Sequence, residues 1–367
     1  MTEIRVSPDG LAALLARIFS AAGGSEEEAR RIGTNLVEAN LAGHDSHGVV
    51  RTQRYVEWAG RGAVRFGQSI TAAIDGGAFA LLEGHRGFGQ SLGGQAVEIG
   101  LAKAREHGVS VIALRNAGHL GRIGAWAEMA CEAGFVSIHF VNVKNSLLVA
   151  PFGGAGRRMS TAPVCVGVPN RTQGTADDFI LDFATSRIAE GKALVALKGG
   201  KPAPPDALID GEGLPTGDPR ALYGDIDRDA VADPRAGPGA LAAMGDHKGS
   251  GLGLACELLA GALTGSGAAG DGSDIHNGML SIYLDPARFD DGHGWSGAVR
   301  DYIAFVRGCA PAKGTASVLI PGDPERARRA ERRRSGLPLA AGVWESILLT
   351  GETLGLNRET MSEGVIL

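Results

Sequence analysis

The chain has 367 residues, of which 36 are basic and 41 acidic, so its formal net charge is −5. A chain of this length is expected to form two or three lobes and to bury a large core without disulfide or metal staples. Apolar residues make up 44% and charged residues 21% of it, which excludes a mainly disordered, collagen-like or coiled-coil protein.

The four cysteines, Cys131, Cys165, Cys256 and Cys309, lie far apart and form no C-x-x-C pair. They are predicted to be reduced, buried thiols, and no metal site is expected. The first residues lack the basic and apolar regions of a signal peptide, and no apolar run approaches the ~18 residues of a membrane span. A cytoplasmic protein without membrane partners is therefore expected.

Residues 1–66 are predicted to be helical. Ser7-Pro8-Asp9 begins one helix, Ser25 begins a second, and a third amphipathic stretch carries Arg51, Tyr55 and Trp58. From residue 67 to 245 the pattern changes to strands alternating with helices. The strands are expected at 109–114, 135–141 and 179–183, and the helices at 96–107, 123–133 and 189–197. This alternation predicts an α/β core, followed by a mostly looped connection over 199–240.

The remaining part, residues 246–367, is predicted to be mixed at first and then helical. A helix is expected over 251–263, strands over 279–284 and 316–320, and a charged helix from Asp323 onward. Six arginines lie between Glu325 and Arg334 and alternate with glutamates in an acidic chain. This pattern favours a solvated helix face over a nucleic-acid site.

The segment Gly87–Gly93 has G-x-G spacing, but its third glycine comes one residue too late for a dinucleotide fingerprint. It is interpreted as a glycine-rich entry into a helix. No phosphate-binding loop of the G-x-x-x-x-G-K-[ST] type occurs either.

Chemistry-bearing residues are densest at His44-Asp45-Ser46-His47-Gly48. If a helix begins near His47, then His47, Arg51 and Tyr55 share one of its faces. A proton donor, a carboxylate clamp and a phenol would suit a small anionic oxo acid. The alternative is a helix cap with solvent-facing histidines.

Three further candidates follow along the chain. His119 lies among glycines after a strand, where open α/β sheets bind ligands. Asp182 lies within an apolar strand and is predicted to be buried and paired, either with an imidazole or in a cap with Thr185 and Ser186. Lys248 stands at the start of a helix, where free N–H groups favour an anion.

Taken together, these segments resemble the malate/L-lactate dehydrogenase family, whose members lack a Rossmann fold. The landmarks run in family order along nearly the whole chain: His44–Gly48 with Arg51 and Tyr55, Asn116–Gly121, Asn145-Ser146, Ala150–Gly153, Leu181–Ser186, Pro215–Pro219, His247–Gly249 and Ile320–Glu325. The resemblance implies a nicotinamide-binding α/β (α+β) domain joined to a helical domain built from both chain ends.

The resemblance also implies an activity and residue roles. The expected reaction is hydride transfer between NAD or NADP and a small 2-hydroxy or 2-oxo acid, with reduction of cyclic imino acids as the alternative. His47, Ser46, Asp182 and His119 would be catalytic, and Arg51, Tyr55 and His44 would bind the substrate. The implied cofactor contacts are His119, Leu120, Gly121, Ser146, Thr161, Ala162, Pro163, Asp182, Phe183, Ala184, Lys248, Pro321, Gly322, Asp323 and Pro324. A homodimer that binds no nucleic acid is expected.

Two positions depart from the family pattern. Ser160-Thr161-Ala162-Pro163 stands where the family usually has Gly-Thr-Asn-Pro, and Ser250 replaces a frequent aromatic residue. The first change removes an amide that could bind the cofactor or the substrate. The second could widen a pocket.

Overall fold

The computed structural model describes residues 3–172, 175–197, 201–226, 233–273 and 275–367. Its helices are α1 (Pro8–Ala21), α2 (Glu26–Leu41), α3 (Thr52–Gly60), α4 (Gly89–His107), α5 (Gly124–Glu132), α6 (Glu190–Leu197), α7 (Arg220–Tyr223), α8 (His247–Cys256), α9 (Trp295–Arg307), α10 (Asp323–Ser335), α11 (Ala341–Thr353) and α12 (Arg358–Ser362). Short 3-10 turns are η1 (Asp45–His47), η2 (Val49–Arg51) and η4 (Pro286–Arg288), and η3 (Glu257–Leu263) is a π-helix that continues α8.

The strands are β1 (Glu3–Val6), β2 (Thr71–Asp75), β3 (Phe79–Glu83), β4 (Val109–Ala117), β5 (Val136–Lys144), β6 (Val164–Val168), β7 (Arg171–Thr172), β8 (Thr175–Ala176), β9 (Phe179–Phe183), β10 (Leu208–Ile209), β11 (Pro215–Thr216), β12 (Ala240–Leu241), β13 (His276–Leu284) and β14 (Leu337–Ala340). Seven of them form the main sheet in the order β2-β3-β4-β13-β5-β6-β9. Of the described pairs in this sheet only β3 and β4 are parallel.

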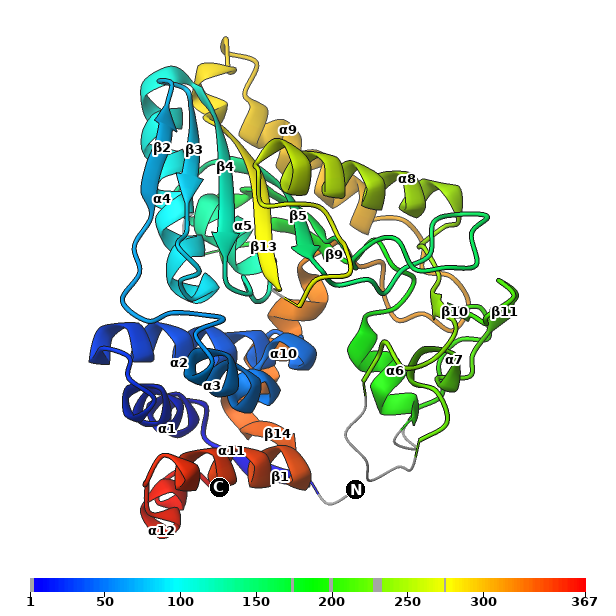
Figure 1. The fold of residues 1–367 in the computed structure, drawn as a ribbon. Helices are drawn as coiled ribbons and strands as arrows, with labels where there is room; N and C mark the ends of the chain where they lie inside the picture. Colours follow the sequence, from blue (N-terminus) through cyan, green and yellow to red (C-terminus); the bar gives the residue numbers. More distant parts are fainter. Residues whose placement is uncertain (1–2, 173–174, 198–200, 227–232, 274) are drawn as a thin grey trace.

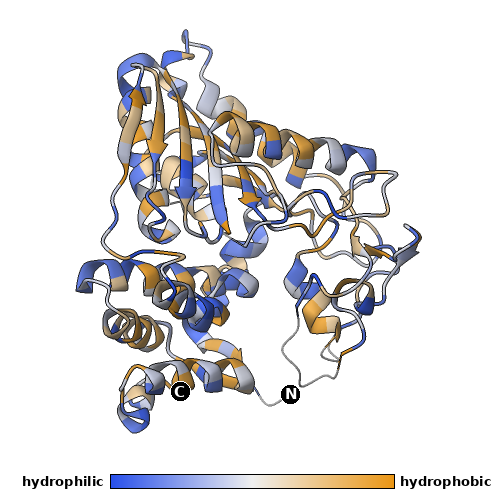
Figure 2. Ribbon diagram, viewed as in Figure 1, coloured by the Kyte–Doolittle hydropathy of each residue, from blue (hydrophilic) through white to orange (hydrophobic). Residues whose placement is uncertain are grey.

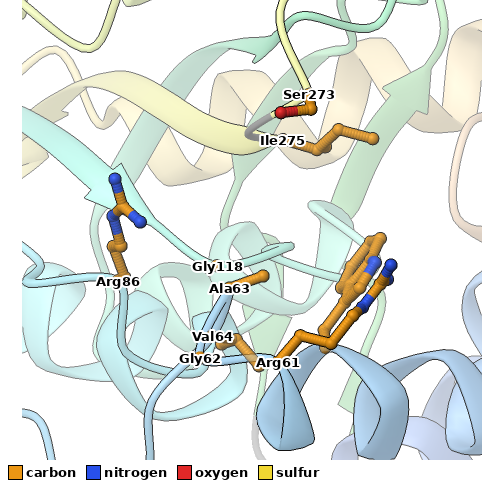
Figure 3. Close-up of a pocket in the computed structure, with 9 residues that line it drawn as sticks. Arg61, Gly62, Ala63, Val64, Arg86, Gly118, Ser273 and Ile275 are labelled. Carbon is orange, nitrogen blue, oxygen red and sulfur yellow. The ribbon is translucent and has the colours of Figure 1, made fainter.

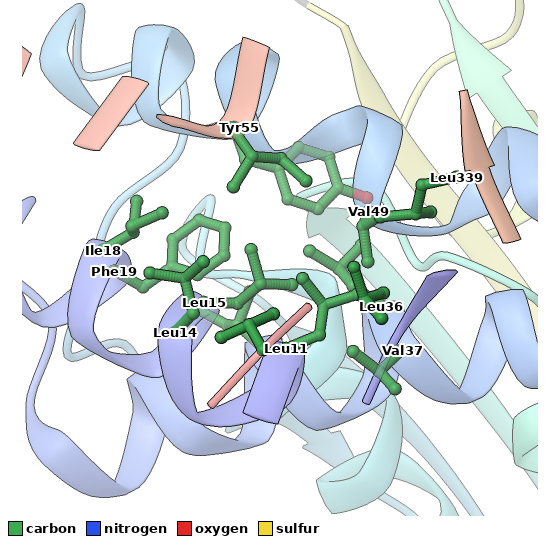
Figure 4. Close-up of a cluster of buried hydrophobic side chains, with 14 of the residues drawn as sticks. Leu11, Leu14, Leu15, Ile18, Phe19, Leu36, Val37, Val49, Tyr55 and Leu339 are labelled. Carbon is green, nitrogen blue, oxygen red and sulfur yellow. The ribbon is translucent and has the colours of Figure 1, made fainter. Parts of the chain in front are cut away.

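The helical domain is built from both ends of the chain (Figure 1). In α1 the apolar residues recur at helical spacing, and Leu11, Leu15 and Ile18 are fully buried. They pack with residues of α2, with Tyr55 of α3 and with Leu339 of β14 (Figure 4). Each such buried side chain contributes about 1.5–3 kcal/mol of hydrophobic stabilisation. This shared core joins the two termini and confirms the predicted fold class.

The main sheet belongs to the α/β domain, where α4 and α5 pack on the sheet. Polar residues lie at the end of β4 that faces the helical domain (Figure 2), and His119 follows directly after that end. Gly89 begins α4, and a Cβ there would lie 2.3 Å from the His119 carbonyl oxygen. The segment Gly87–Gly93 is thus a helix entry, as predicted, and its glycine permits close packing beside His119.

Part of the predicted loop over 199–240 forms a third lobe. Leu208, Leu222, Tyr223 and Leu241 are fully buried in its own apolar core, and β10, β11 and β12 form a small sheet. Residues 199–200 and 227–232 of this segment lie outside the described residues. The boundaries 1–66, 67–245 and 246–367 stay a prediction.

Three predictions of local structure are wrong. Residues 316–320 form no strand, and they run as irregular backbone before α10. Helix α3 begins at Thr52, not near His47, because two 3-10 turns precede it. Cys309 is exposed, whereas the other three cysteines are buried.

The arginines of α10 match the prediction of a solvated face only in part, because Arg328, Arg333 and Arg334 are exposed and the others are not. Arg332 is buried, and Arg326, Arg329 and Arg333 form ion pairs with acids outside α10. These acids lie far from α10 in the sequence, so the local pattern could not show them.

Among the described residues, no helix combines the length and apolar character that crossing a membrane requires. Asp290, Asp291 and His293 gather in the loop before α9 and include none of the predicted site residues.

Candidate active site

Two histidines from different domains face each other. His47 lies in η1 of the helical domain and His119 follows β4 of the α/β domain. Their rings stack with centroids 5.7 Å apart and planes 13° from parallel. The fold therefore places both predicted catalytic imidazoles in one site between the domains.

Tyr55 and Gln90 determine which nitrogen of His119 carries a proton. The Gln90 amide donates to Tyr55 Oη over 3.0 Å and to the His119 carbonyl over 3.2 Å. Burial raises the pKa of Tyr55 to about 12, so its hydroxyl stays protonated. This O–H donates a hydrogen bond to His119 Nδ1, 2.5 Å away. The neutral His119 ring then carries its N–H at Nε2. Gln90 was not predicted as a site residue, although it lies within the glycine-rich segment 87–93.

Both imidazoles are neutral at pH 7. Burial is the largest cause and lowers the pKa of His119 to about 3 and that of His47 well below 6.5. The positive charge of Arg51 lowers both values further, and the adjacent His119 ring lowers that of His47 because protonating both rings would place two positive charges side by side. A neutral imidazole can accept a proton from a substrate hydroxyl.

The loop that carries His47 is held by short contacts. Ser46 Oγ lies 3.1 Å from His47 Nδ1, and Arg51 Nε donates to the Ser46 carbonyl over 2.6 Å. The predicted grouping of His47, Arg51 and Tyr55 therefore forms, but through two 3-10 turns and not along one continuous helix.

Asp182 lies at the end of β9. It is half-buried, whereas a buried carboxylate was predicted. Its Oδ2 accepts from the Gly124 N–H at the start of α5 over 2.7 Å. Burial raises its pKa, and the neighbouring His44 and Arg122 side chains oppose that rise. In the described parts of the chain, the hydrogen bond of the His47 ring goes to Ser46, and none joins it to Asp182.

Arg122 was not predicted from the sequence. It is 3% exposed, is paired with Glu128, and lies beside Asp182. Its Nε and Nη1 have no hydrogen-bond acceptor among the described residues. A buried guanidinium with free donors favours a ligand that brings acceptor atoms.

A hollow of about 310 Å³ opens beside Asp182. Its walls come from β9 and from the segment before and within α10: Ile180, Leu181, Asp182, Leu319, Ile320, Pro321, Gly322, Pro324 and Glu325. Four of the predicted cofactor contacts therefore line one cavity. Asp323 does not line it, because its carboxylate pairs with Arg307 and Arg326 instead.

Two other predicted cofactor segments, 161–163 and 183–184, lie around the end of β9. Thr161, Ala162 and Pro163 precede β6, which pairs with β9 so that Val164 lies opposite Phe183. The Thr161 and Met244 backbones both bond Thr185, next to Ala184. Ala162 has φ +35°, a conformation that asparagine tolerates better than alanine.

Leu120, Gly121, Ser146 and Lys248 complete the predicted set. Leu120 is buried, and Gly121 beside it has φ +72°. Ser146 follows β5, and Lys248 is exposed in the first turn of α8. For the described residues, no hydrogen bond links Ser146 or Lys248 to the histidine pair.

A second hollow of about 240 Å³ lies on the Gly118 side of His119 (Figure 3). Trp58, Arg61, Val64 and Arg86 are among its lining residues, and Trp58 stacks on Tyr55. No motif or spacing in the sequence predicts this hollow.

The third lobe approaches the loop 44–48. A Cβ on Gly191 of α6 would lie 3.0 Å from Ser46 Cβ, so the two backbones are close. Beside Gly191, the Glu190 carboxylate accepts from Tyr223 Oη over 2.6 Å. The loop with His47 thus has α6 as a neighbour in addition to the two domains.

One family model and several known proteins match this chain over most of its length. The family model for malate/L-lactate dehydrogenase matches residues 6–348. Hydroxycarboxylate dehydrogenase B of Escherichia coli O157:H7 is 36% identical, covering 97% of this chain and 96% of that protein. The sulfolactate dehydrogenase structure from Methanocaldococcus jannaschii has a TM-score of 0.83 at 28% identity, covering 97% and 99% of the two chains. A Δ1-piperideine-2-carboxylate reductase from Pseudomonas syringae has a TM-score of 0.79 at 29% identity, covering 94% and 99%.

The chain therefore belongs to the malate/L-lactate dehydrogenase family. It is an oxidoreductase that transfers a hydride between a nicotinamide cofactor and a small 2-hydroxy or 2-oxo acid.

The site fits such a cofactor. The hollow beside Asp182 combines apolar walls with two carboxylates, those of Asp182 and Glu325, and buried Arg122 supplies two nitrogens that have no acceptor among the described residues. When bound, the nicotinamide supplies the hydride acceptor for oxidation or the hydride donor for reduction.

Proposed function

We propose that this enzyme oxidises a small 2-hydroxy acid, or reduces the matching 2-oxo acid, with His47 moving the proton at the substrate oxygen. The observation that supports this proposal is the stacked His47–His119 pair between two domains. His119, protonated at Nε2, donates a hydrogen bond to the same oxygen. His47 accepts the hydroxyl proton in the oxidation and returns it in the reduction.

Arg51 binds the substrate carboxylate in this proposal. Its Nε holds the Ser46 carbonyl, which leaves the two terminal nitrogens as donors for a carboxylate. Tyr55 and His44 complete the substrate side, and Ser46 orients His47 through Nδ1. Asp182 stabilises positive charge at the site. Asp182, Phe183 and Ala184, together with Pro321 and its neighbours, contact the cofactor in the hollow.

The proposal is tested with purified enzyme, NAD and NADP in both redox states, and a panel of 2-hydroxy and 2-oxo acids, followed at 340 nm. We expect cofactor turnover that requires one of these acids, with one of the two cofactors preferred. Acids and esters of matched size serve as the control, because an ester lacks the charge that Arg51 binds. Equal turnover of acid and ester would contradict the carboxylate clamp.

Reduction of cyclic imino acids is the second candidate. It is favoured by the similarity to the piperideine-2-carboxylate reductase structure, and it needs the same carboxylate clamp. The same assay includes cyclic 2-carboxylate imines. Turnover of imines alone would replace the 2-hydroxy acid as the substrate.

A homodimer is proposed from exposed apolar side chains on α8, η3 and α9. Tyr302 and Phe305 of α9 stack on each other and are 68% and 77% exposed. Leu254, Leu258 and Leu263 are exposed as well. An exposed patch of this kind is typical of a subunit interface. A cytoplasmic location stays a prediction from the sequence.

We expect light scattering to give twice the mass of one chain and the variant Phe305→Glu to give one chain mass. Leu349→Glu on α11 is the matched control, because Leu349 is also exposed but lies on another helix. A wild-type enzyme that is monomeric at micromolar concentration would contradict the proposal.

A further inference from the structure

One face of α10 contacts the active site at three places. Glu325, Arg329 and Arg332 lie four and three residues apart and so share a face of this helix. Glu325 pairs with His44 at 3.3 Å, and Arg329 pairs with Glu128 at 3.2 Å. Glu128 in turn holds Arg122 beside Asp182. The face is thus connected to both domains of the site.

Arg332 makes the most specific of these contacts. Its guanidinium binds both carboxylate oxygens of Asp45, at 2.6 and 3.1 Å, and also donates to the Asn40 carbonyl. Arg332 is 8% exposed, whereas the Asp45 side chain is half exposed, so the buried guanidinium holds a carboxylate at the protein surface. A bidentate pair of this kind fixes direction as well as distance.

Asp45 belongs to the turn that carries His47. The His47 N–H donates to the His44 carbonyl, and the Gly48 N–H donates to that of Asp45. The side chain of Asn40 donates to Asp45 Oδ1 over 2.7 Å and accepts from the Val49 N–H over 2.8 Å. A Cβ on Gly48 would lie 2.0 Å from Asn40 Oδ1, so this packing requires glycine there. The conformation of the turn therefore depends on the Asp45 carboxylate.

We propose that Arg332 is a positioning residue for the reaction: through Asp45 it fixes the turn 45–47, and with it the His47 imidazole opposite His119. Glu325 contacts the same loop through His44, and Arg329 contacts Glu128 near the Asp182 edge of the sheet. One helix therefore joins the two parts of the site. The inference rests on the proposed role of His47. It gives a role to buried Arg332 on a helix whose Arg328, Arg333 and Arg334 are exposed.

The test is a double-mutant cycle on the full-length enzyme with its preferred cofactor and acid. Arg332→Met in the wild-type background is expected to lower kcat roughly tenfold to hundredfold, because a misplacement of about 1 Å can cost that much. In the His47→Ala background the same change is expected to alter kcat less than about twofold, since the imidazole it positions is gone. The KM for the cofactor stays unchanged in both.

Two further variants keep the test decisive if Arg332→Met folds poorly. Arg332→Lys keeps the charge but loses the bidentate geometry, and Asp45→Asn keeps the shape but loses the charge. Both are expected to lower kcat while retaining the wild-type melting temperature within a few degrees. Arg333→Met is the matched control, because exposed Arg333 has no described contact with the loop 44–48 and pairs with Glu38, which keeps its second pair with Arg329.

The outcomes separate the two proposals. If His47→Ala is inactive but the Arg332 and Asp45 variants keep full kcat, the positioning role is wrong and the proposed function stands. An equal loss of kcat in both backgrounds would show a general structural role and overturn the inference. If His47→Ala keeps full activity, the proposed role of His47 is the one that fails.

Discussion

Replacing His47 with alanine is expected to lower kcat for oxidation of the 2-hydroxy acid by about 10²–10⁴-fold, the usual contribution of a positioned general base. The imidazole lies opposite His119, and Ser46 bonds its Nδ1. The KM of the cofactor is expected to stay within a few-fold of the wild-type value. Steady-state kinetics with the preferred acid measures both parameters.

The pH dependence checks the same residue. Burial, the adjacent His119 ring and the charge of Arg51 lower the pKa of His47 well below 6.5. The base form is therefore present at pH 7, and it is lost only when the pH falls through the lowered value. We expect kcat/KM for oxidation to stay level from pH 8 to 6.5 and to decline below that. The decline of kcat/KM at acidic pH should disappear in His47→Ala. A decline that begins at or above pH 6.5 in the wild-type enzyme would contradict the lowered pKa of His47.

The substitution Arg51→Lys is expected to have the second large effect on kcat/KM for the acid. Lysine keeps the positive charge but offers no planar pair of donors, and a charge-assisted hydrogen bond contributes about 1.5–3 kcal/mol. The kcat/KM for the acid is therefore expected to fall by about 10–10²-fold, mainly through KM, with an unchanged cofactor KM. A change confined to the cofactor KM would instead assign Arg51 to the cofactor.

The control for this variant is Arg54→Lys. Arg54 lies three residues further along the chain in α3 and is exposed. It has the same charge as Arg51, which immediately precedes α3, but no described hydrogen bond joins it to the loop 44–48. Its substitution is expected to change kcat/KM less than about threefold, since a surface charge contributes little.

The arginine-rich helix illustrates where sequence reasoning failed. Its charges alternate in the way that solvated helices show, and the prediction followed that local pattern. The partners of Arg329 and Arg332 are Glu128 and Asp45, about 200 and 290 residues away in the chain. Only the folded chain brings them together, and so the inward-facing arginines and buried Arg122 could not be predicted.

Sequence alone determined the fold class, the family and most of the site segments, because periodicity, turn residues and short motifs are local properties of the chain. It could also place His47, Arg51 and His119 in one candidate site by resemblance. Tertiary structure decided which side chains are in contact. Tyr55 and Gln90 set the tautomer of His119, Asp182 accepts a hydrogen bond from Gly124 and not from His47, and Arg332 binds Asp45. These contacts join segments far apart in the chain, and their energies depend on distance and burial, which arise only when the domains pack together.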